Sequence, residues 1–296
     1  MLELQARSIC QHADPAFVGT IYVISNEPRF LRFKKQFYAH VFDAYGDLKD
    51  RVQLIDGKKM LHSFRKKGGW IRQQILKLLA ARIITADYVL ILDSKNHFIR
   101  RLNEAALFNP DGKMRTVTYP LNTAFTEKFE RACDLFGIAP TEADFANAMP
   151  QSTPYLASKD LIKRMLAETE GLLATDFENA FINLGPFTEF YLHYAFILSK
   201  PGLFETIYDS GKNVNVTFWN PANETAESFG HKLEKIKQSH ICSIGIHKRY
   251  IKNAPEGFLK AISEIWGEAG LIRGDSEVSY FMKLPQKRRR FFGFIF

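Results

Sequence analysis

Hydrophobic and polar positions along the first third of the chain switch between the period of a strand and that of a helix. A β-branched and aromatic run at residues 19–26 is followed by apolar residues at helical spacing over residues 28–46. The same patterns predict a strand over residues 51–56, a strong helix over residues 68–85 and a strand over residues 88–93. Because strand and helix alternate, this part of the chain predicts an α/β fold.

The third predicted strand is apolar at every position from residue 88 to residue 92 and does not alternate. This pattern is typical of a strand in a parallel sheet that helices cover on both faces. Ligands of such open sheets bind beyond the carboxyl ends of the strands. Asn26 and Asp93 follow predicted strands, so the expected topology places both at the candidate site.

The second half of the chain predicts more helix than strand. Apolar spacing and capping residues indicate helices over residues 126–138, 158–171, 188–199 and 255–272, and strands at residues 115–120 and 241–247. No internal repeat and no linker rich in Pro, Gly or Ser marks a domain boundary. We therefore expect a single domain over residues 1–282, followed by a tail at residues 283–296.

Composition and charge narrow the class of partner. The chain has 46% hydrophobic and 24% charged residues, which is typical of a folded globular protein without long disordered tracts. Its formal net charge of +8 favours anionic partners. We expect no nucleic acid among them, because the charge comes without the aromatic and basic motif of a known recognition module.

The tail at residues 283–296 joins basic side chains to aromatic ones. Lys287 to Arg290 precede four phenylalanines and an isoleucine. Basic residues are attracted to anionic lipid and phenylalanines bury among headgroups, so the tail predicts contact with a membrane surface. A terminal strand packed on the core is the alternative interpretation.

The spacing of the cysteines and the length of the apolar runs indicate where in the cell the protein is expected. Cys10, Cys133 and Cys242 are far apart and have no C-x-x-C spacing, which indicates neither a disulfide framework nor a zinc cluster and fits a reducing cytosol. The first residues lack the apolar core of a signal peptide, and no stretch reaches about 18 uninterrupted apolar residues. We expect a cytoplasmic protein, with peripheral contact at the inner membrane face through the tail.

Polar side chains follow one face of the predicted helix at residues 68–85. Trp70, Gln73, Gln74 and Lys77 fall at positions i, i+3, i+4 and i+7, opposite a stripe of isoleucine and leucine. A face of this kind is either solvated or part of a binding site, and the spacing alone leaves both open.

Asp93 and Glu189 are the candidate acids. A carboxylate at the end of a buried strand requires a metal, a base or a hydroxyl partner, although aspartate also begins many structural turns. Glu189 starts the predicted helix at residues 188–199, where an acid also stabilises the helix without any catalytic role.

Four ordered segments carry a family resemblance. The segments "GGWIRQQILKL", "YVLILDSKNHFI", "FTEFYLHYAF" and "SIGIHKR" lie within residues 68–250. In this order they resemble the DUF6492 group of glycosyltransferase-like proteins. The resemblance implies a GT-A type fold, with a Rossmann-like, mostly parallel sheet flanked by helices and a more helical C-terminal half. It also implies a nucleotide-sugar donor and an acid-x-acid turn that holds a divalent ion against the donor diphosphate.

The resemblance also implies roles for individual residues. Asp93 matches the first acid of the turn, Glu189 is the candidate general base for the acceptor hydroxyl, and His247 matches a late histidine. Asp93 and His247 are then the candidate metal ligands. The candidate donor-binding residues are Asn26, Gln73, Gln74, Lys77, Lys95 and Lys248.

This sequence departs from the family pattern at Lys95, which stands where the second acid is expected. A lysine repels a divalent cation. One hypothesis is that Lys95, with Lys77 and Lys248 or Arg249, replaces Mn²⁺ or Mg²⁺ as counter-charge, while Asp93 binds a ribose hydroxyl or orients Lys95. A second keeps the metal on Asp93 and His247, with Asn96 as an outer partner. A third is a degenerate site.

Two functions follow from these alternatives. The leading prediction is a glycosyltransferase that moves a sugar from a nucleotide-sugar to a glycan or lipid-linked acceptor, in surface polysaccharide or lipopolysaccharide assembly. The alternative is a catalytically degenerate binding or scaffold protein with the same fold, which would bind ligand without turnover.

Overall fold

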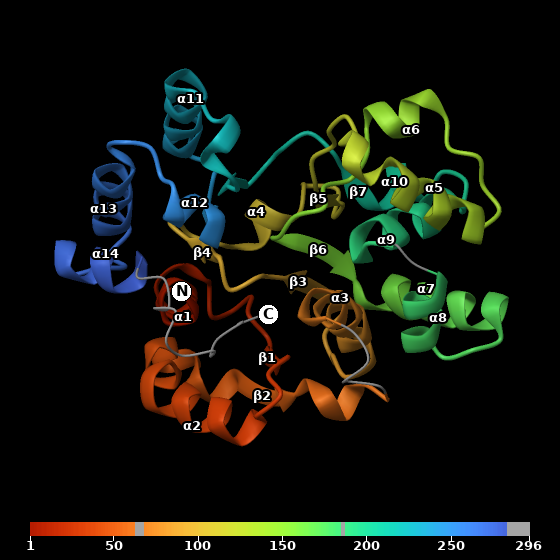
Figure 1. Ribbon diagram of the computed structural model, residues 1–296, viewed down its shortest axis with the longest axis horizontal. Coiled ribbons are helices and arrows are strands. Elements are labelled where there is room, and N and C mark those ends of the chain that lie inside the picture. Colours follow the sequence, from red (N-terminus) through yellow and green to blue (C-terminus); the bar gives the residue numbers. More distant parts are fainter. Residues whose placement is uncertain (63–67, 185–186, 283–296) are drawn as a thin grey trace. The chain divides into compact units, whose positions relative to one another are not determined.

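The computed structural model describes residues 1–62, 68–184 and 187–282 (Figure 1). Within these residues the chain divides into two compact units. Unit 1 comprises residues 1–54, 92–106 and 213–282, and unit 2 comprises the described parts of residues 55–91 and 107–212. The single domain expected over residues 1–282 stays a prediction, and the tail at residues 283–296 lies outside the described residues.

Unit 1 contains helices on either side of short strands. Its helices are α1 (Leu2–His12), α2 (Phe30–His40), α11 (Ala226–Lys237), α12 (Lys248–Lys252), α13 (Phe258–Glu268) and α14 (Asp275–Met282), with 3₁₀ turns η1 (Phe42–Arg51) and η5 (Pro221–Asn223). Its strands are β1 (Ile21–Ser25), β4 (Asn96–Phe98), β8 (Asn215–Phe218) and β9 (Ser243–Ile246). Two elements span the boundaries between the units, β2 (Val52–Asp56), which pairs with β1, and α4 (Glu104–Leu107).

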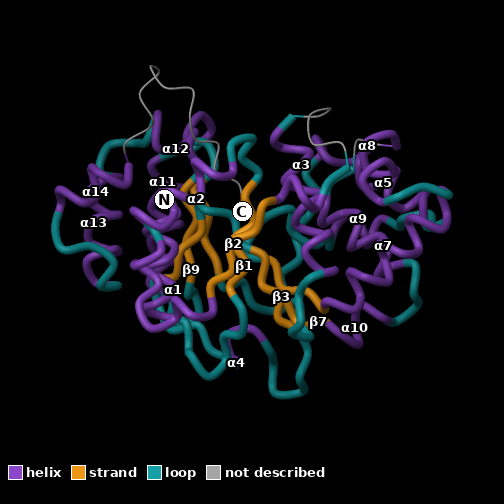
Figure 2. The backbone as a smooth tube through the Cα atoms, turned by 90° about the horizontal axis from the view of Figure 1, so that it is seen from below, coloured by secondary structure: helices purple, strands orange, loops and turns teal. Residues whose placement is uncertain are grey.

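A three-stranded sheet in the order β4-β9-β8 organises unit 1. β9 pairs antiparallel with β4 and parallel with β8, so that Gly245 lies opposite both Asn96 and Thr217. The amino end of β4 therefore lies at the same end of the sheet as the carboxyl ends of β8 and β9. We refer to this end of the strands as the edge of the sheet. α1 packs against β4, and Figure 2 shows this helix next to β9, the strand that pairs with β4.

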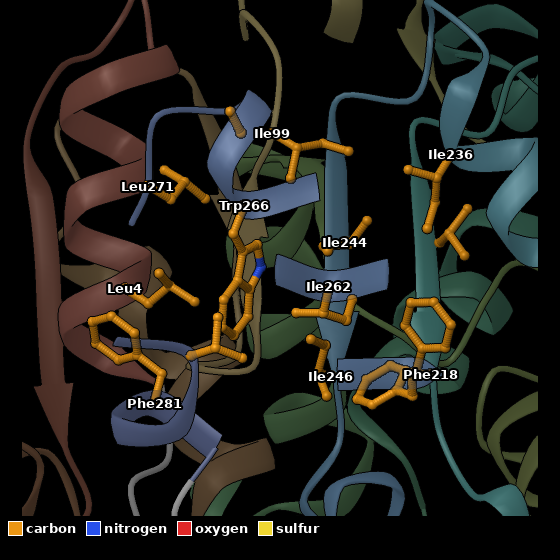
Figure 3. Close-up of a cluster of buried hydrophobic side chains, with 14 of the residues drawn as sticks. Leu4, Ile99, Phe218, Ile236, Ile244, Ile246, Ile262, Trp266, Leu271 and Phe281 are labelled. Atoms are coloured by element: carbon orange, nitrogen blue, oxygen red, sulfur yellow. The ribbon is translucent and has the colours of Figure 1, made fainter. Parts of the chain in front are cut away.

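The core of unit 1 is a cluster of apolar side chains around Trp266 (Figure 3). Leu4 of α1 and Phe281 of α14 reach this cluster from opposite ends of the sequence. The indole of Trp266 is fully buried and donates a hydrogen bond of 2.7 Å to Nε2 of His97 on β4. Aliphatic residues of β8 and β9 complete the cluster, which joins the sheet to α1, α13 and α14.

Unit 2 is mostly helical. Its helices are α3 (Gly69–Leu79), α5 (Thr126–Leu135), α6 (Glu142–Ala146), α7 (Lys159–Leu173), α8 (Phe177–Leu184), α9 (Glu189–Leu198) and α10 (Leu203–Ile207), with 3₁₀ turns η2 (Gly57–Met60), η3 (Ala80–Arg82) and η4 (Thr123–Phe125). Its strands are β3 (Tyr88–Ile91), β5 (Met114–Arg115), β6 (Tyr155–Ser158) and β7 (Tyr208–Asp209). α9 is buried along nearly its whole length, as expected of a helix that is apolar on all sides.

The chain is a mixed α/β protein, but the strands pair differently from the sequence prediction. β3 pairs antiparallel with β6, whereas β5 pairs parallel with β7. The prediction that β3 lies in a parallel sheet covered on both faces is therefore wrong. Tyr88 at its start is 47% exposed and contacts Phe108 edge-on, so the apolar run reflects local aromatic packing as well as burial.

The six helices predicted from apolar spacing are confirmed and correspond to α2, α3, α5, α7, α9 and α13. The strand predicted over residues 115–120 is wrong, because β5 ends at Arg115. None of the helices that the structure describes is long and apolar enough to cross a bilayer. Cys10, Cys133 and Cys242 are free thiols.

Gly245 provides a test of the sheet register. A Cβ atom at this position would lie 2.9 Å from Oγ1 of Thr217 and 3.0 Å from Nδ2 of Asn96. Thr217 Oγ1 already accepts a hydrogen bond of 2.8 Å from Asn215, so neither neighbour can move without a cost. We expect Gly245→Ala to lower the free energy of unfolding by about 1–3 kcal/mol in urea denaturation.

Gly230→Ala is the matched control, because a Cβ on this α11 residue has no heavy atom within 4 Å. Alanine in a helix interior should leave stability unchanged or raise it by up to about 1 kcal/mol. Equal stability of Gly245→Ala and wild type would contradict the close three-strand packing.

Candidate functional site

Hydrogen bonds fix the turn that carries Asp93 and Lys95 in unit 1. The backbone N–H of Asn96 donates to the carbonyl of Asp93 (2.9 Å), and Oδ1 of Asn96 accepts from the N–H of Asp93 (3.1 Å). Gln5 of α1 is buried and donates from Nε2 to the carbonyls of Asp93 (2.8 Å) and Asn96 (2.9 Å). A side chain at the start of the sequence therefore closes the turn and holds its residues in place.

Lys95 forms an ion pair with Asp93 inside this turn. The side chains of Lys95 and Asp93 are only 10% and 20% exposed. A lysine removed from water to this extent needs an opposite charge, which Asp93 supplies. Nζ of Lys95 also lies 4.7 Å from the ring centroid of Trp219, within the range of a cation–π contact.

Three side chains meet at one edge of the sheet in unit 1. Lys95 precedes β4, whereas Trp219 follows β8 and His247 follows β9. The pairing of the three strands brings these positions to the same edge. The rings of Trp219 and His247 have centroids 5.6 Å apart and are tilted by 40°. We refer to Asp93, Lys95, Trp219 and His247 as the Lys95 cluster.

His247 in the Lys95 cluster favours its neutral form. Burial is the main cause that lowers its pKa below the ordinary 6.5, and the positive charges of Lys95, Arg249 and Lys248 lower it further. Nδ1 of His247 accepts a hydrogen bond of 3.3 Å from the N–H of Arg249, and this caps α12. The imidazole therefore serves as a neutral hydrogen-bonding group next to lysine and arginine.

The other candidate residues of unit 1 differ in exposure. Asn26 follows β1 and is buried. Lys248 and Arg249 open α12 directly after His247, and both are exposed. The edge of the sheet thus combines a buried ion pair with two exposed positive side chains.

A second buried ion pair lies in unit 2. Nζ of Lys77 lies 3.0 Å from Oε1 of Glu189, and their side chains are 8% and 10% exposed. Oε1 of Gln74 accepts a hydrogen bond of 3.2 Å from the backbone N–H of Glu189. Nζ of Lys77 also lies 5.2 Å from the ring centroid of Phe190. We refer to Gln74, Lys77, Glu189 and Phe190 as the Lys77 cluster.

The Lys77 cluster shows which side chains on the polar face of α3 are buried. Gln74 is buried and Lys77 nearly so, whereas Trp70 is 54% exposed and Gln73 is half-buried. This face is therefore solvated only in part, and its buried side chains fasten α3 to the first turn of α9. Such contacts give Glu189 a structural role, and its role as general base stays a prediction.

Two buried histidines are bound into the cores. His193 of α9 is fully buried, and its Nδ1 lies 2.8 Å from the hydroxyl of Tyr155, whose ring stacks on Phe190 at 4.0 Å. Burial lowers the pKa of His193 to about 3 and that of His97 likewise to about 3. Both imidazoles are therefore neutral at pH 7, in keeping with a structural role.

The residues present do not favour a divalent ion at the Lys95 cluster. Lys95 forms an ion pair with the carboxylate of Asp93, and its ammonium would repel a cation bound by Asp93 and His247. Among residues 1–62, 68–184 and 187–282, no three His, Cys, Asp or Glu side chains gather as a set of metal ligands. The prediction of a metal on Asp93 and His247 rests on the resemblance alone.

The structure assigns the candidate residues to separate units. Asn26, Asp93, Lys95, Asn96, His247 and Lys248 belong to unit 1, and Gln73, Gln74, Lys77 and Glu189 belong to unit 2. Trp219 and Gln5 were not among the residues predicted from the sequence. Trp219 comes directly after the β-branched and aromatic run "NVTF", which is a strand signal, whereas no local pattern identifies Gln5 as the partner of a distant turn.

These features define a mixed α/β protein in which each unit holds a buried lysine against a carboxylate. The sequence model of the family of unknown function DUF6492 matches residues 2–243. The chain therefore belongs to the DUF6492 family. A comparison with curated proteins gives no match.

The Lys77–Glu189 pair can be tested by a double-mutant cycle. Lys77→Met or Glu189→Gln alone removes one member of the ion pair and leaves the other buried, so the losses of the two single variants should add up to more than the loss in the double variant. We expect a coupling free energy of about 1–3 kcal/mol from urea denaturation. The same cycle on the exposed pair Lys237–Glu234 of α11 should show little or no coupling. Additive effects at Lys77 and Glu189 would exclude the buried pair.

His193 predicts a dependence of stability on pH. Its folded pKa of about 3 lies below the ordinary 6.5, so between these values the unfolded chain binds a proton that the folded chain does not. The free energy of unfolding should therefore fall as pH decreases from 6.5, with His193 contributing about 1.4 kcal/mol per pH unit.

His193→Gln should reduce the slope of unfolding free energy against pH by about one proton. His240→Gln replaces an exposed histidine and should leave the slope as in wild type. An unchanged slope in His193→Gln would show that His193 is not held neutral.

Proposed function

We propose that the chain is a glycosyltransferase that moves a sugar from a nucleotide-sugar donor to a glycan or lipid-linked acceptor, in surface polysaccharide or lipopolysaccharide assembly. A GT-A type fold with a Rossmann-like donor-binding sheet is part of this proposal. The observation that carries it is the Lys95 cluster, where a buried lysine occupies the turn position that the family pattern gives to an acid. The four ordered segments that resemble glycosyltransferase-like proteins also support the proposal.

The chemistry requires a counter-charge for the leaving group. The bond between the anomeric carbon and the diphosphate oxygen breaks, and the electron pair stays on the diphosphate. The acceptor oxygen bonds to the anomeric carbon, and its proton passes to a base. Fixed cations stabilise the departing diphosphate as a metal ion does elsewhere.

Lys95, Lys248 and Arg249 are the proposed cations for this step. Asp93 offsets the charge of Lys95 in the unliganded chain and holds its ammonium at the edge of the sheet. Asp93 is thereby a positioning residue in the proposal, and the exposed Lys248 and Arg249 supply the net positive charge. Contact of the tail at residues 283–296 with the inner membrane face is part of the same proposal.

A noncatalytic binding or scaffold protein is the second candidate. The specific observation in its favour is that Lys95 neutralises Asp93, so that the turn has neither a free carboxylate pair nor a resident cation site. Such a protein would bind a nucleotide without turnover.

Thermal unfolding with nucleotides tests the proposal. We expect one of UDP, GDP, CDP and CMP to raise the unfolding temperature equally in manganese and in EDTA, because lysine and arginine supply the counter-charge. Ligand at about 100 times its dissociation constant stabilises the folded chain by about 2.7 kcal/mol. A shift that needs manganese would restore the metal to Asp93, and no shift with any nucleotide would overturn the donor-binding proposal.

Lys95→Asp separates the two candidate functions. The substitution restores the acid-x-acid turn, so a transferase should gain dependence on manganese in hydrolysis of its nucleotide-sugar. Lys260→Asp makes the same charge change at an exposed position of α13 and should behave as wild type. A chain that binds the nucleotide but shows no turnover as wild type or as Lys95→Asp would favour the scaffold.

A further inference from the structure

Trp219 is one of the large side chains that unit 1 exposes, and it is the one that lies in the Lys95 cluster. It is 42% exposed, whereas Trp266 in the same unit is fully buried. Trp219 directly follows β8, and the preceding residue, Phe218, is fully buried in the core. The strand therefore anchors its last residue in the core and presents the next one, Trp219, at the edge of the sheet.

Two neighbours hold the indole of Trp219 in position. The ammonium of Lys95 lies over the ring at 4.7 Å from the centroid, and Asp93 holds that ammonium in turn. The imidazole of His247 contacts the indole at 5.6 Å with a tilt of 40°, which is not a parallel stack. A ring placed in this way is preorganised, and its exposed area is available to a flat partner.

The charges around Trp219 select the class of that partner. Lys248 and Arg249 follow His247 and are exposed, while Asp93 is offset by Lys95. A ligand that suits both features carries a flat ring together with negative charge. Aromatic side chains stack on every nucleobase, because each base has a π-face, and exposed lysine and arginine attract phosphates.

We propose that Trp219 is the platform on which the base of a nucleoside diphosphate stacks, with the phosphates facing Lys248 and Arg249. This inference rests on the proposed function and names the part of the donor that the edge of the β4-β9-β8 sheet recognises. Trp219 is then a binding residue. Its contribution is tolerant of base identity, because stacking does not read hydrogen-bonding groups.

Calorimetric titration of the whole chain with UDP, GDP, CDP and inorganic pyrophosphate tests this inference. Trp219→Leu should lower the affinity for the nucleoside diphosphate that binds wild type by about tenfold or more, as expected for loss of one stacked base. Trp219→Phe retains a ring and should lower this affinity less. Pyrophosphate has no base, so its affinity should change little in either variant.

Controls separate stacking from loss of fold and from the proposed function itself. Tyr38→Leu removes another exposed ring of unit 1 and should leave every affinity unchanged. Thermal unfolding of each variant establishes that it is folded. If Trp219→Leu binds the nucleotide with wild-type affinity, the platform is overturned and the proposed function stays intact. Equal losses of affinity for nucleotide and pyrophosphate would have the same consequence. If no nucleotide binds wild type, both the platform and the proposed function are overturned.

Discussion

Pairing of β9 with strands on both sides is the constraint on which unit 1 depends. β4 joins it antiparallel and β8 joins it parallel, and Gly245 leaves room for side chains of both neighbours. This register sets where each strand ends. Because the ends coincide, Lys95, Trp219 and His247 come from distant parts of the sequence to one edge. The candidate chemistry is thus a consequence of backbone pairing before any side chain is considered.

A buried lysine held against a carboxylate recurs in the two units, with different consequences. Lys77 and Glu189 join α3 to α9, and the N–H of Glu189 adds a further hydrogen bond to Gln74. Lys95 and Asp93 are instead neighbours in one turn, and the ammonium of Lys95 also contacts Trp219 beyond β8. Removing a charge from water is costly, so in both units the lysine depends on its carboxylate partner.

The positions of helices could be predicted from the sequence better than the elements against which each strand or helix packs. Helices such as α7 and α13 have a strong local period, which is why their positions were predictable. The antiparallel pairing of β3 with β6 depends on residues far along the chain, and the continuous apolar run, although typical of parallel strands, does not identify that partner. Likewise, helical spacing placed Gln74 and Lys77 on one face of α3, but only packing against α9 determines that this face is partly buried. Lys95 was recognised as a departure, whereas its aromatic neighbour Trp219 was not.

The discontinuous make-up of unit 1 bears on how the protein is synthesised. The apolar face of α1 packs through Leu4 against Trp266 and Phe281, and Arg7 pairs with Glu277 at 2.9 Å. On the ribosome, α1 is synthesised well before α13 and α14, which cover its apolar face. Until α13 and α14 have emerged, this apolar surface stays exposed and the core of unit 1 is incomplete.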